Sequence, residues 1–214
     1  MSKNKTIQSK CAICGKISEQ NVLLSVSSLG YMDLDTRPAS PMREYLSNSI
    51  QECPCCHYCN SDISIKDTNV SQITLQLPAY SKLVSNNNID SLTKKFLLSA
   101  TINRALTKNK DAGYMYLYAA WRFDDLNNID NAKKARLKAI DCFKKYLNHS
   151  NDHHCAVIVV DLLRRCEEFD EAIDTANFIL ALTEDQLLRQ VLNLEIELSQ
   201  KKDSSVHNVG EVAK

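Results

Sequence analysis

The chain has 214 residues, 44% of them hydrophobic, and its 26 basic side chains are balanced by 26 acidic ones. This length allows one large domain, or one small and one medium domain. The absence of a basic excess argues against a nucleic-acid or anionic-membrane partner. The first ten residues are polar, unlike a secretory signal, and the longest strongly apolar run, 156–160, cannot span a bilayer. We therefore expect a cytoplasmic protein whose thiols are free or metal-bound.

Residues 1–10 are predicted to be a disordered lead-in. Two Cys-x-x-Cys pairs follow, formed by Cys11, Cys14, Cys53 and Cys56. Such a pair directs two sulfurs at one ion from a tight turn, and thiolates are preferred zinc ligands. The four cysteines therefore predict a structural Zn²⁺ site, and residues 11–66 are interpreted as a zinc-ribbon-like module on a β-hairpin.

Three neighbouring side chains leave the choice of ligands open. Cys59 is spaced from Cys56 as in a second pair, and Cys55 and His57 lie between the candidate ligands. The same cluster suits a redox sensor in which Cys55 or Cys59 attacks a ligand thiol. A nucleophilic thiol needs a lowered pKa, which the adjacent Glu52 opposes. We prefer the structural zinc site, with His57 pointing away from the ion.

Between the pairs we expect a short strand at 21–26 and a second strand at 46–52. The intervening residues 27–45 contain Gly30 and two prolines and are predicted to form an irregular loop. Charged side chains in this loop suit internal ion pairs first and a recognition loop second; they are Asp33, Asp35 and Arg37.

Residues 67–89 are interpreted as a connecting segment. Its part 69–84 fits a strand or a helix, and we favour a helix because Pro78 suits a first helical position. The polar run 85–88 is the expected domain boundary.

From residue 90 to 202 apolar residues recur with helical spacing, and six helices are predicted. They begin near residues 90, 111, 129, 152, 169 and 183. Asp152 is expected to cap the fourth with Cys155 turned inward, and Thr183 with Gln186 to form a capping box on the sixth. Cys142, Cys155 and Cys166 are interpreted as buried apolar residues. Residues 203–214 are predicted to be a disordered tail.

The link between the fourth and fifth helices has the aromatic–alanine spacing of tetratricopeptide helix pairs, through Phe169 and Ala172. The fold class expected is therefore mainly α: a small zinc-stapled β-hairpin module followed by an antiparallel, tetratricopeptide-like helical domain. Trp121 is predicted to be a core wedge. Asp124 and Asp125 oppose the dipole of the helix they end, so a cation should compensate them, the candidates being Arg122, Lys133 and Arg136.

An ordered set of motifs resembles a known group of proteins. The set comprises Cys11-x-x-Cys14, Asp33-Leu-Asp35-Thr-Arg37-Pro38, Cys53-Pro54-x-Cys56-x-Tyr58, Ala119-Ala120-Trp121-x-x-Asp124-Asp125, Ala135-Arg136 and Ala139. Over about residues 11–180 the chain resembles uncharacterised bacterial proteins with an N-terminal zinc-ribbon-like segment and a C-terminal tetratricopeptide-like region. The group usually has glycine where this chain has His57. The resemblance implies a fold and a metal but no reaction.

No Ser-His-Asp set, phosphate-binding glycine loop or His-Glu-x-x-His motif is recognisable, and no catalytic residue is proposed. The function expected is that of a zinc-binding, non-catalytic interaction protein. Its helical domain would hold a protein or peptide partner, without nucleic acid or membrane. The alternatives are the redox sensor and a metal-dependent enzyme that uses the N-terminal loop.

Overall fold

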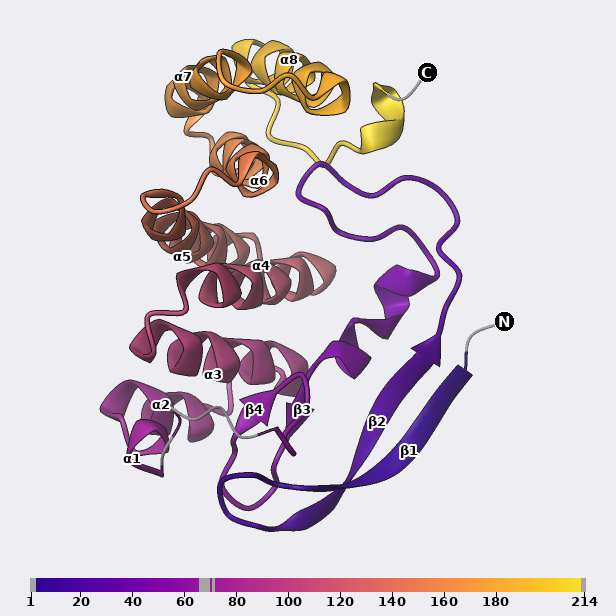
Figure 1. Cartoon of the computed structure of the whole chain (residues 1–214), viewed down its shortest axis with the longest axis vertical. Helices are drawn as coiled ribbons and strands as arrows, with labels where there is room; N and C mark the ends of the chain where they lie inside the picture. The colour runs from indigo at the N-terminus through magenta and orange to yellow at the C-terminus, as the bar shows by residue number, and fades with distance from the viewer. Residues whose placement is uncertain (1–2, 66–69, 71, 213–214) are drawn as a thin grey trace.

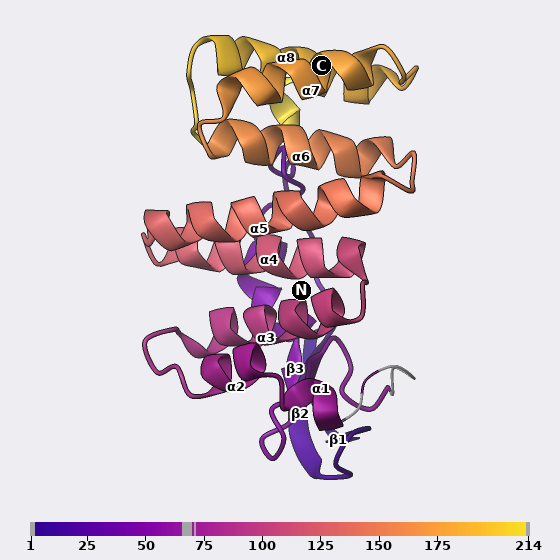
Figure 2. The same ribbon diagram turned by 90° about the vertical axis from the view of Figure 1, so that its left-hand side faces the viewer.

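The computed structural model describes residues 3–65, 70 and 72–212. The end of the expected zinc module at 66 and the start of the connecting segment at 67 lie outside these residues. In the described part of the chain, eight α-helices stack in a column, and the N-terminal segment, residues 3–65, lies along one side of it (Figure 1). The view turned by 90° places the strands and the loop behind the helices (Figure 2).

The N-terminus begins with a β-hairpin and not with a disordered lead-in. Strand β1 (Lys3–Lys10) pairs antiparallel with β2 (Ile17–Ser25), from Lys10 opposite Ile17 to Lys3 opposite Ser25. The prediction for residues 1–10 was wrong over 3–10 because β1 has almost no apolar pattern of its own. Its order comes from the hydrogen-bond ladder to β2, which a reading of local composition misses.

The second expected strand is mostly a 3-10 helix, η1 (Met42–Ser49), and only β3 (Gln51–Glu52) pairs, with β4 (Cys59–Asn60). Pro41 has helical backbone angles at the N-terminus of η1, which favours a turn over a strand. The irregular loop before it and the strand at 21–26 are as predicted, the strand beginning earlier.

The helices are α1 (Gln72–Leu75), α2 (Pro78–Val84), α3 (Ser91–Ala105), α4 (Asn109–Asp125), α5 (Ile129–Leu147), α6 (His153–Arg165), α7 (Phe169–Leu180) and α8 (Gln186–Gln200). The six helices predicted after residue 90 are present, and Pro78 occupies the first turn of α2 as expected. Consecutive helices from α3 onward run antiparallel (Figure 2). Among the described helices, none has the combination of length and apolar composition required to cross a bilayer.

Four helix ends use a left-handed residue other than glycine. Positive φ angles occur at Thr107, Asn127, Glu167 and Lys202. In each case the next residue donates its N–H to a carbonyl five residues back, as in Lys108 N–H to Asn103 O at 2.9 Å. This is the hydrogen bond of a Schellman cap, which ends the helix and turns the chain.

The caps of α6 and α8 differ in how well the sequence predicted them. The Asp152 carboxylate accepts from the Cys155 N–H at 3.0 Å, and Cys155 is buried, as predicted. Helix α8 is not capped by Thr183. Asp185 accepts from the Leu188 N–H at 3.0 Å, and the Thr183 hydroxyl instead accepts from the Asp185 N–H at 3.3 Å. The carboxylate two residues later is the better acceptor and starts the helix there.

The tail after α8 is ordered up to Val212, contrary to the prediction. Leu34 N–H donates to His207 O at 3.0 Å, and Val209 N–H donates to Met32 O at 2.9 Å. Gly210 lies so close to the Tyr31 ring that a Cβ would not fit. The tail and the loop therefore meet beside α6, although they are far apart in the sequence (Figure 1).

The loop also enters the helical core. Trp121 is 2% exposed, which agrees with the prediction of a core wedge, and its indole N–H donates to Asp35 at 2.6 Å. The charge of Asp124 is compensated by Arg136, which is one of the three predicted candidates, and by Arg165 at 3.2 Å. Asp125 pairs with Arg37 of the loop at 2.6 Å. Two other candidates are engaged elsewhere, since Arg122 pairs with Asp90 and Lys133 with Glu167.

Candidate metal centre

The first Cys-x-x-Cys pair forms the tip of the β1–β2 hairpin. The Cys11 N–H donates to Lys16 O at 2.8 Å, and the Gly15 N–H donates to Cys11 O at 2.9 Å. Gly15 has φ +76°, a left-handed conformation that glycine adopts without strain. The Ile13 N–H donates to the Cys11 sulfur at 3.4 Å. The turn therefore fixes both sulfurs on its inner side.

The second pair repeats this backbone arrangement at the tip of the β3–β4 hairpin. The Cys53 N–H donates to Tyr58 O at 2.9 Å, and the His57 N–H donates to Cys53 O at 2.9 Å. His57 takes the place of Gly15 and has φ +59°. The turn geometry is thus kept without the glycine, at the cost of a strained backbone conformation.

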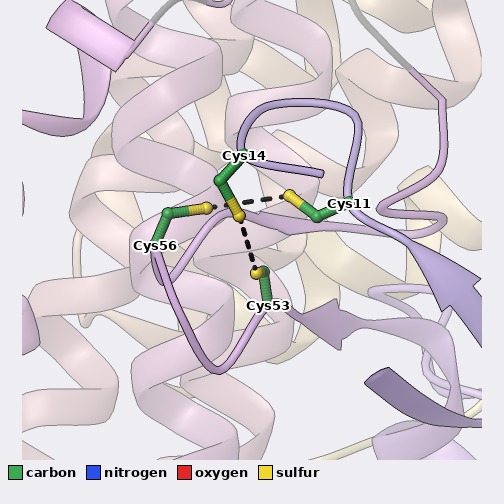
Figure 3. Close-up of side chains that lie close together, drawn as sticks. All are labelled: Cys11, Cys14, Cys53 and Cys56. Carbon is green, nitrogen blue, oxygen red and sulfur yellow. Dashed lines mark hydrogen bonds between the residues drawn. The ribbon is translucent and has the colours of Figure 1, made fainter. Parts of the chain in front are cut away.

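The two turns bring four sulfurs together. Cys11 Sγ lies 3.7 Å from Cys56 Sγ, and Cys14 Sγ lies 3.5 Å from Cys53 Sγ (Figure 3). All four sulfurs lie within 4.8 Å of one another. A tetrahedron of thiolates with metal–sulfur bonds of about 2.3 Å has edges of about 3.8 Å. The cluster therefore has the size of a tetrahedral four-sulfur site.

The cluster is partly buried, with Cys11 and Cys53 on the inside. Burial raises the pKa of the Cys53 and Cys56 thiols above the usual 9.0. A hydrogen bond from the Lys16 backbone lowers the pKa of the Cys14 thiol to about 7. Four ionised thiols in such a space would repel one another strongly, and a bound cation is what makes a set of four thiolates stable.

The alternative ligands lie outside this cluster. The Cys59 thiol is buried and donates to His57 O at 3.3 Å, and burial raises its pKa well above 9.0. Cys55 is exposed. The His57 ring is held by the Glu52 carboxylate at 2.9 Å. Among the described residues, the potential ligand groups that converge are the four cysteines alone.

Two residues that support the second turn, Tyr80 and Gln20, belong to no sequence motif, and the sequence did not predict their role. The Tyr80 hydroxyl of α2 donates to His57 O at 2.5 Å, and Tyr80 is 1% exposed. The Gln20 amide of β2 donates to Glu52 O at 2.9 Å, which joins the two hairpins. The second turn is therefore anchored to both the first hairpin and the helices.

Residues 4–201 match the model of a family described as "Uncharacterized protein conserved in bacteria (DUF2225)". The chain belongs to this family. No curated protein and no solved structure matches the chain. The site in this DUF2225 protein therefore has to be interpreted from its own geometry.

An ion bound by all four sulfurs would have no free coordination position for catalysis. Four protein ligands complete a tetrahedral shell, whereas catalytic zinc sites keep one position for water or substrate. A metal held here would add a link between two hairpins that are otherwise joined by hydrogen bonds such as Gln20 to Glu52 O. A two-stranded hairpin by itself is at best marginally stable in water.

Proposed function

We propose that the protein binds one Zn²⁺ through Cys11, Cys14, Cys53 and Cys56, and that the ion has a structural role. The observation that carries the proposal is that two turns with the same hydrogen-bond pattern bring four sulfurs within 4.8 Å of one another. A four-thiolate tetrahedral set selects zinc or iron. Zinc is favoured because it forms closed structural sites of this composition.

The ion would position the N-terminal segment, residues 3–65, on the helices. The second turn is bonded to Tyr80 of α2, and the segment after it is bonded to the first turn, since the Ala12 N–H donates to Ile63 O at 2.8 Å. Loss of the metal would therefore loosen both hairpins and the docking of α2.

We further propose that the protein is a non-catalytic scaffold that binds a protein or peptide partner through a tetratricopeptide-like helical half. The antiparallel helix pairs support this, but the side of the column next to the N-terminal segment is covered by the chain itself. The open apolar groove of about 420 Å³ at the ends of α5, α6 and α7 is the surface we assign to an apolar segment of the partner. Phe178 and Leu182 border it and are 67% and 55% exposed.

The redox-sensor alternative has less support. Its proposed nucleophiles are Cys55 and Cys59. Cys55 is exposed and is not one of the four converging thiols, and the raised pKa of Cys59 disfavours the thiolate. Treatment with peroxide followed by thiol titration and metal analysis separates the two functions. A sensor would release metal as Cys55 or Cys59 is consumed, and a structural site would keep its metal.

Metal analysis of purified full-length protein tests the zinc proposal. We expect one zinc and no iron per chain, retention of zinc in Cys59→Ser, and loss of zinc in Cys53→Ser. A Cys53→Ser protein with full zinc content would refute the assignment. For the partner, co-purification from host extract should be lost in Phe178→Asp and kept in the control Leu137→Asp, which changes an exposed leucine on α5. Equal capture by both variants would refute the groove.

A further inference from the structure

A fully buried charge cluster joins α6, α8 and the tail, at the opposite end of the helical column from the β3–β4 hairpin of the candidate metal centre (Figure 1). Arg164 of α6 is 0% exposed and donates from Nε to Glu195 of α8 at 2.6 Å and from Nη2 to Asp161 at 2.7 Å. Its Nη1 donates to the backbone oxygens of Asp203 and Ser205 at 2.7 and 2.9 Å. One guanidinium thus ties two helices and the tail together.

The charges of this cluster do not balance. Arg164 faces two carboxylates, those of Asp161 and Glu195. The adjoining ion pairs do not supply the missing positive charge, since Arg165 and Arg136 are matched by Asp35 and Asp124. The connected buried set therefore has one carboxylate more than it has arginines. Burial of an unpaired charge is strongly unfavourable.

The hydrogen bonds of the two carboxylates are also incomplete. Asp161 Oδ2 and Glu195 Oε1 are buried and have no hydrogen-bond partner in the described part of the chain, and the same holds for Ser199 Oγ, one turn along α8. Asp161 and Glu195 accept from two nitrogens of the same guanidinium, Nη2 and Nε of Arg164, which brings the two carboxyl groups close together. A proton on one carboxyl would turn an unpaired acceptor into a donor for the other and would remove the excess charge.

We propose that Asp161 and Glu195 share one proton at neutral pH, and that this proton holds the tail, residues 203–212, on the helices. Loss of the proton at alkaline pH leaves two ionised carboxylates in contact. Their repulsion separates α6 from α8 and displaces Arg164, whose two bonds to the tail are then lost. The loop that pairs with the tail is released with it.

The surroundings of the pair favour this state. The charged groups that face it are Arg164 and Arg165 on α6, Asp35 on the loop and Glu211 on the tail, while the Asp203 carboxylate is engaged by Ser205 and His207. Helix α7 also packs on α6 and α8, but its acidic residues are exposed. Burial, reinforced by the Asp161 charge, raises the pKa of Glu195 well above 4.5.

The raised pKa of Glu195 determines how the stability of the fold changes with pH. Because the folded state holds the proton more tightly than the unfolded state, unfolding releases it, and stability falls as pH rises above the unfolded pKa of Glu195. One proton corresponds to a tenfold rise of the unfolding constant per pH unit until the folded pair ionises. The pKa of Asp35 is raised to about 6, so Asp35 is mostly ionised above pH 6.5, and comparison with Glu195→Gln isolates the Asp161–Glu195 pair.

The test compares full-length metal-loaded wild type with Glu195→Gln, Asp161→Asn and the control Glu197→Gln, an exposed neighbour on α8. Infrared spectroscopy should detect a protonated carboxyl at pH 7.5 in wild type and Glu197→Gln, and none in Glu195→Gln. Between pH 6.5 and 8.5 the unfolding constant of wild type should rise relative to Glu195→Gln by up to tenfold per unit.

Amide exchange of the tail, corrected for its intrinsic pH dependence, provides the second measurement. Protection of residues 203–212 should fall in wild type as the carboxyl band disappears and should persist in Glu195→Gln. If Glu195→Gln does not fold, the wild-type band and its loss in Asp161→Asn still decide the matter. No carboxyl band in wild type, or tail protection that is unchanged when the band disappears, would overturn the proposal.

Discussion

Trp121 is where the loop and the helices depend most directly on each other. Its indole N–H donates to the buried Asp35 carboxylate at 2.6 Å, and its ring packs against Tyr118 with centroids 4.8 Å apart. Trp121→Phe keeps most of the ring volume and removes the N–H. A hydrogen bond to a charged group contributes about 1.5–3 kcal/mol, and the smaller ring leaves a small void, so the expected loss of stability is about 2–4 kcal/mol.

Urea denaturation followed by circular dichroism measures this loss, and a double-mutant cycle with Asp35→Asn isolates the hydrogen bond. The coupling free energy between the two sites should be about 1.5–3 kcal/mol. In the wild type, emission of this single tryptophan should be blue-shifted and resistant to acrylamide. A loss below about 0.5 kcal/mol, the range of surface substitutions, together with quenchable emission would refute the reasoning.

The same pair predicts a pH effect. Burial and the nearby Asp161 raise the pKa of Asp35 from 3.8 to about 6, and the hydrogen bond from Trp121 partly offsets this. Because the folded pKa is raised, the stability contributed by Asp35 falls as pH rises from about 3.8 to about 6. In Trp121→Phe the pKa should rise further, which extends the falling part of the stability profile above pH 6. An unchanged profile would contradict the assigned bond.

Three further substitutions test local features. Thr107→Gly should stabilise the protein by about 0.5–1 kcal/mol in thermal melts, since it relieves a β-branched residue at φ +57°; destabilisation would contradict the strain. Asp185→Ala should cost about 1 kcal/mol through loss of the α8 cap, while the exposed neighbour Glu184 can be replaced by alanine with little effect; equal effects would argue against the cap. Tyr80→Phe should leave the zinc content unchanged but speed metal release to a chelator, because the second turn loses its bond to α2; release at the wild-type rate would show that the bond does not support the site.

The sequence alone predicted features that depend on near neighbours in the chain. Helical spacing of apolar residues located the six helices after residue 90, because packing of one helix face is encoded every three to four residues. Each Cys-x-x-Cys turn is likewise local, and this is why all four converging cysteines were identified. The Asp152 cap was found for the same reason.

Features that depend on distant partners were decided only by the tertiary structure. Strand β1 and the tail are polar and lack a local signal, and each is ordered by hydrogen bonds to a segment elsewhere, β2 for the strand and the loop for the tail. The sequence preferred Cys56 but left Cys59 open as a ligand, and only the direction in which the second turn points its sulfurs places Cys56, and not Cys59, in the cluster. The partners of Asp35 on the helices are 86 and 130 residues away, at Trp121 and Arg165, and no periodicity records contacts at such separations. A local sequence pattern determines which side of a helix is buried, whereas the three-dimensional packing determines which distant residues that side contacts.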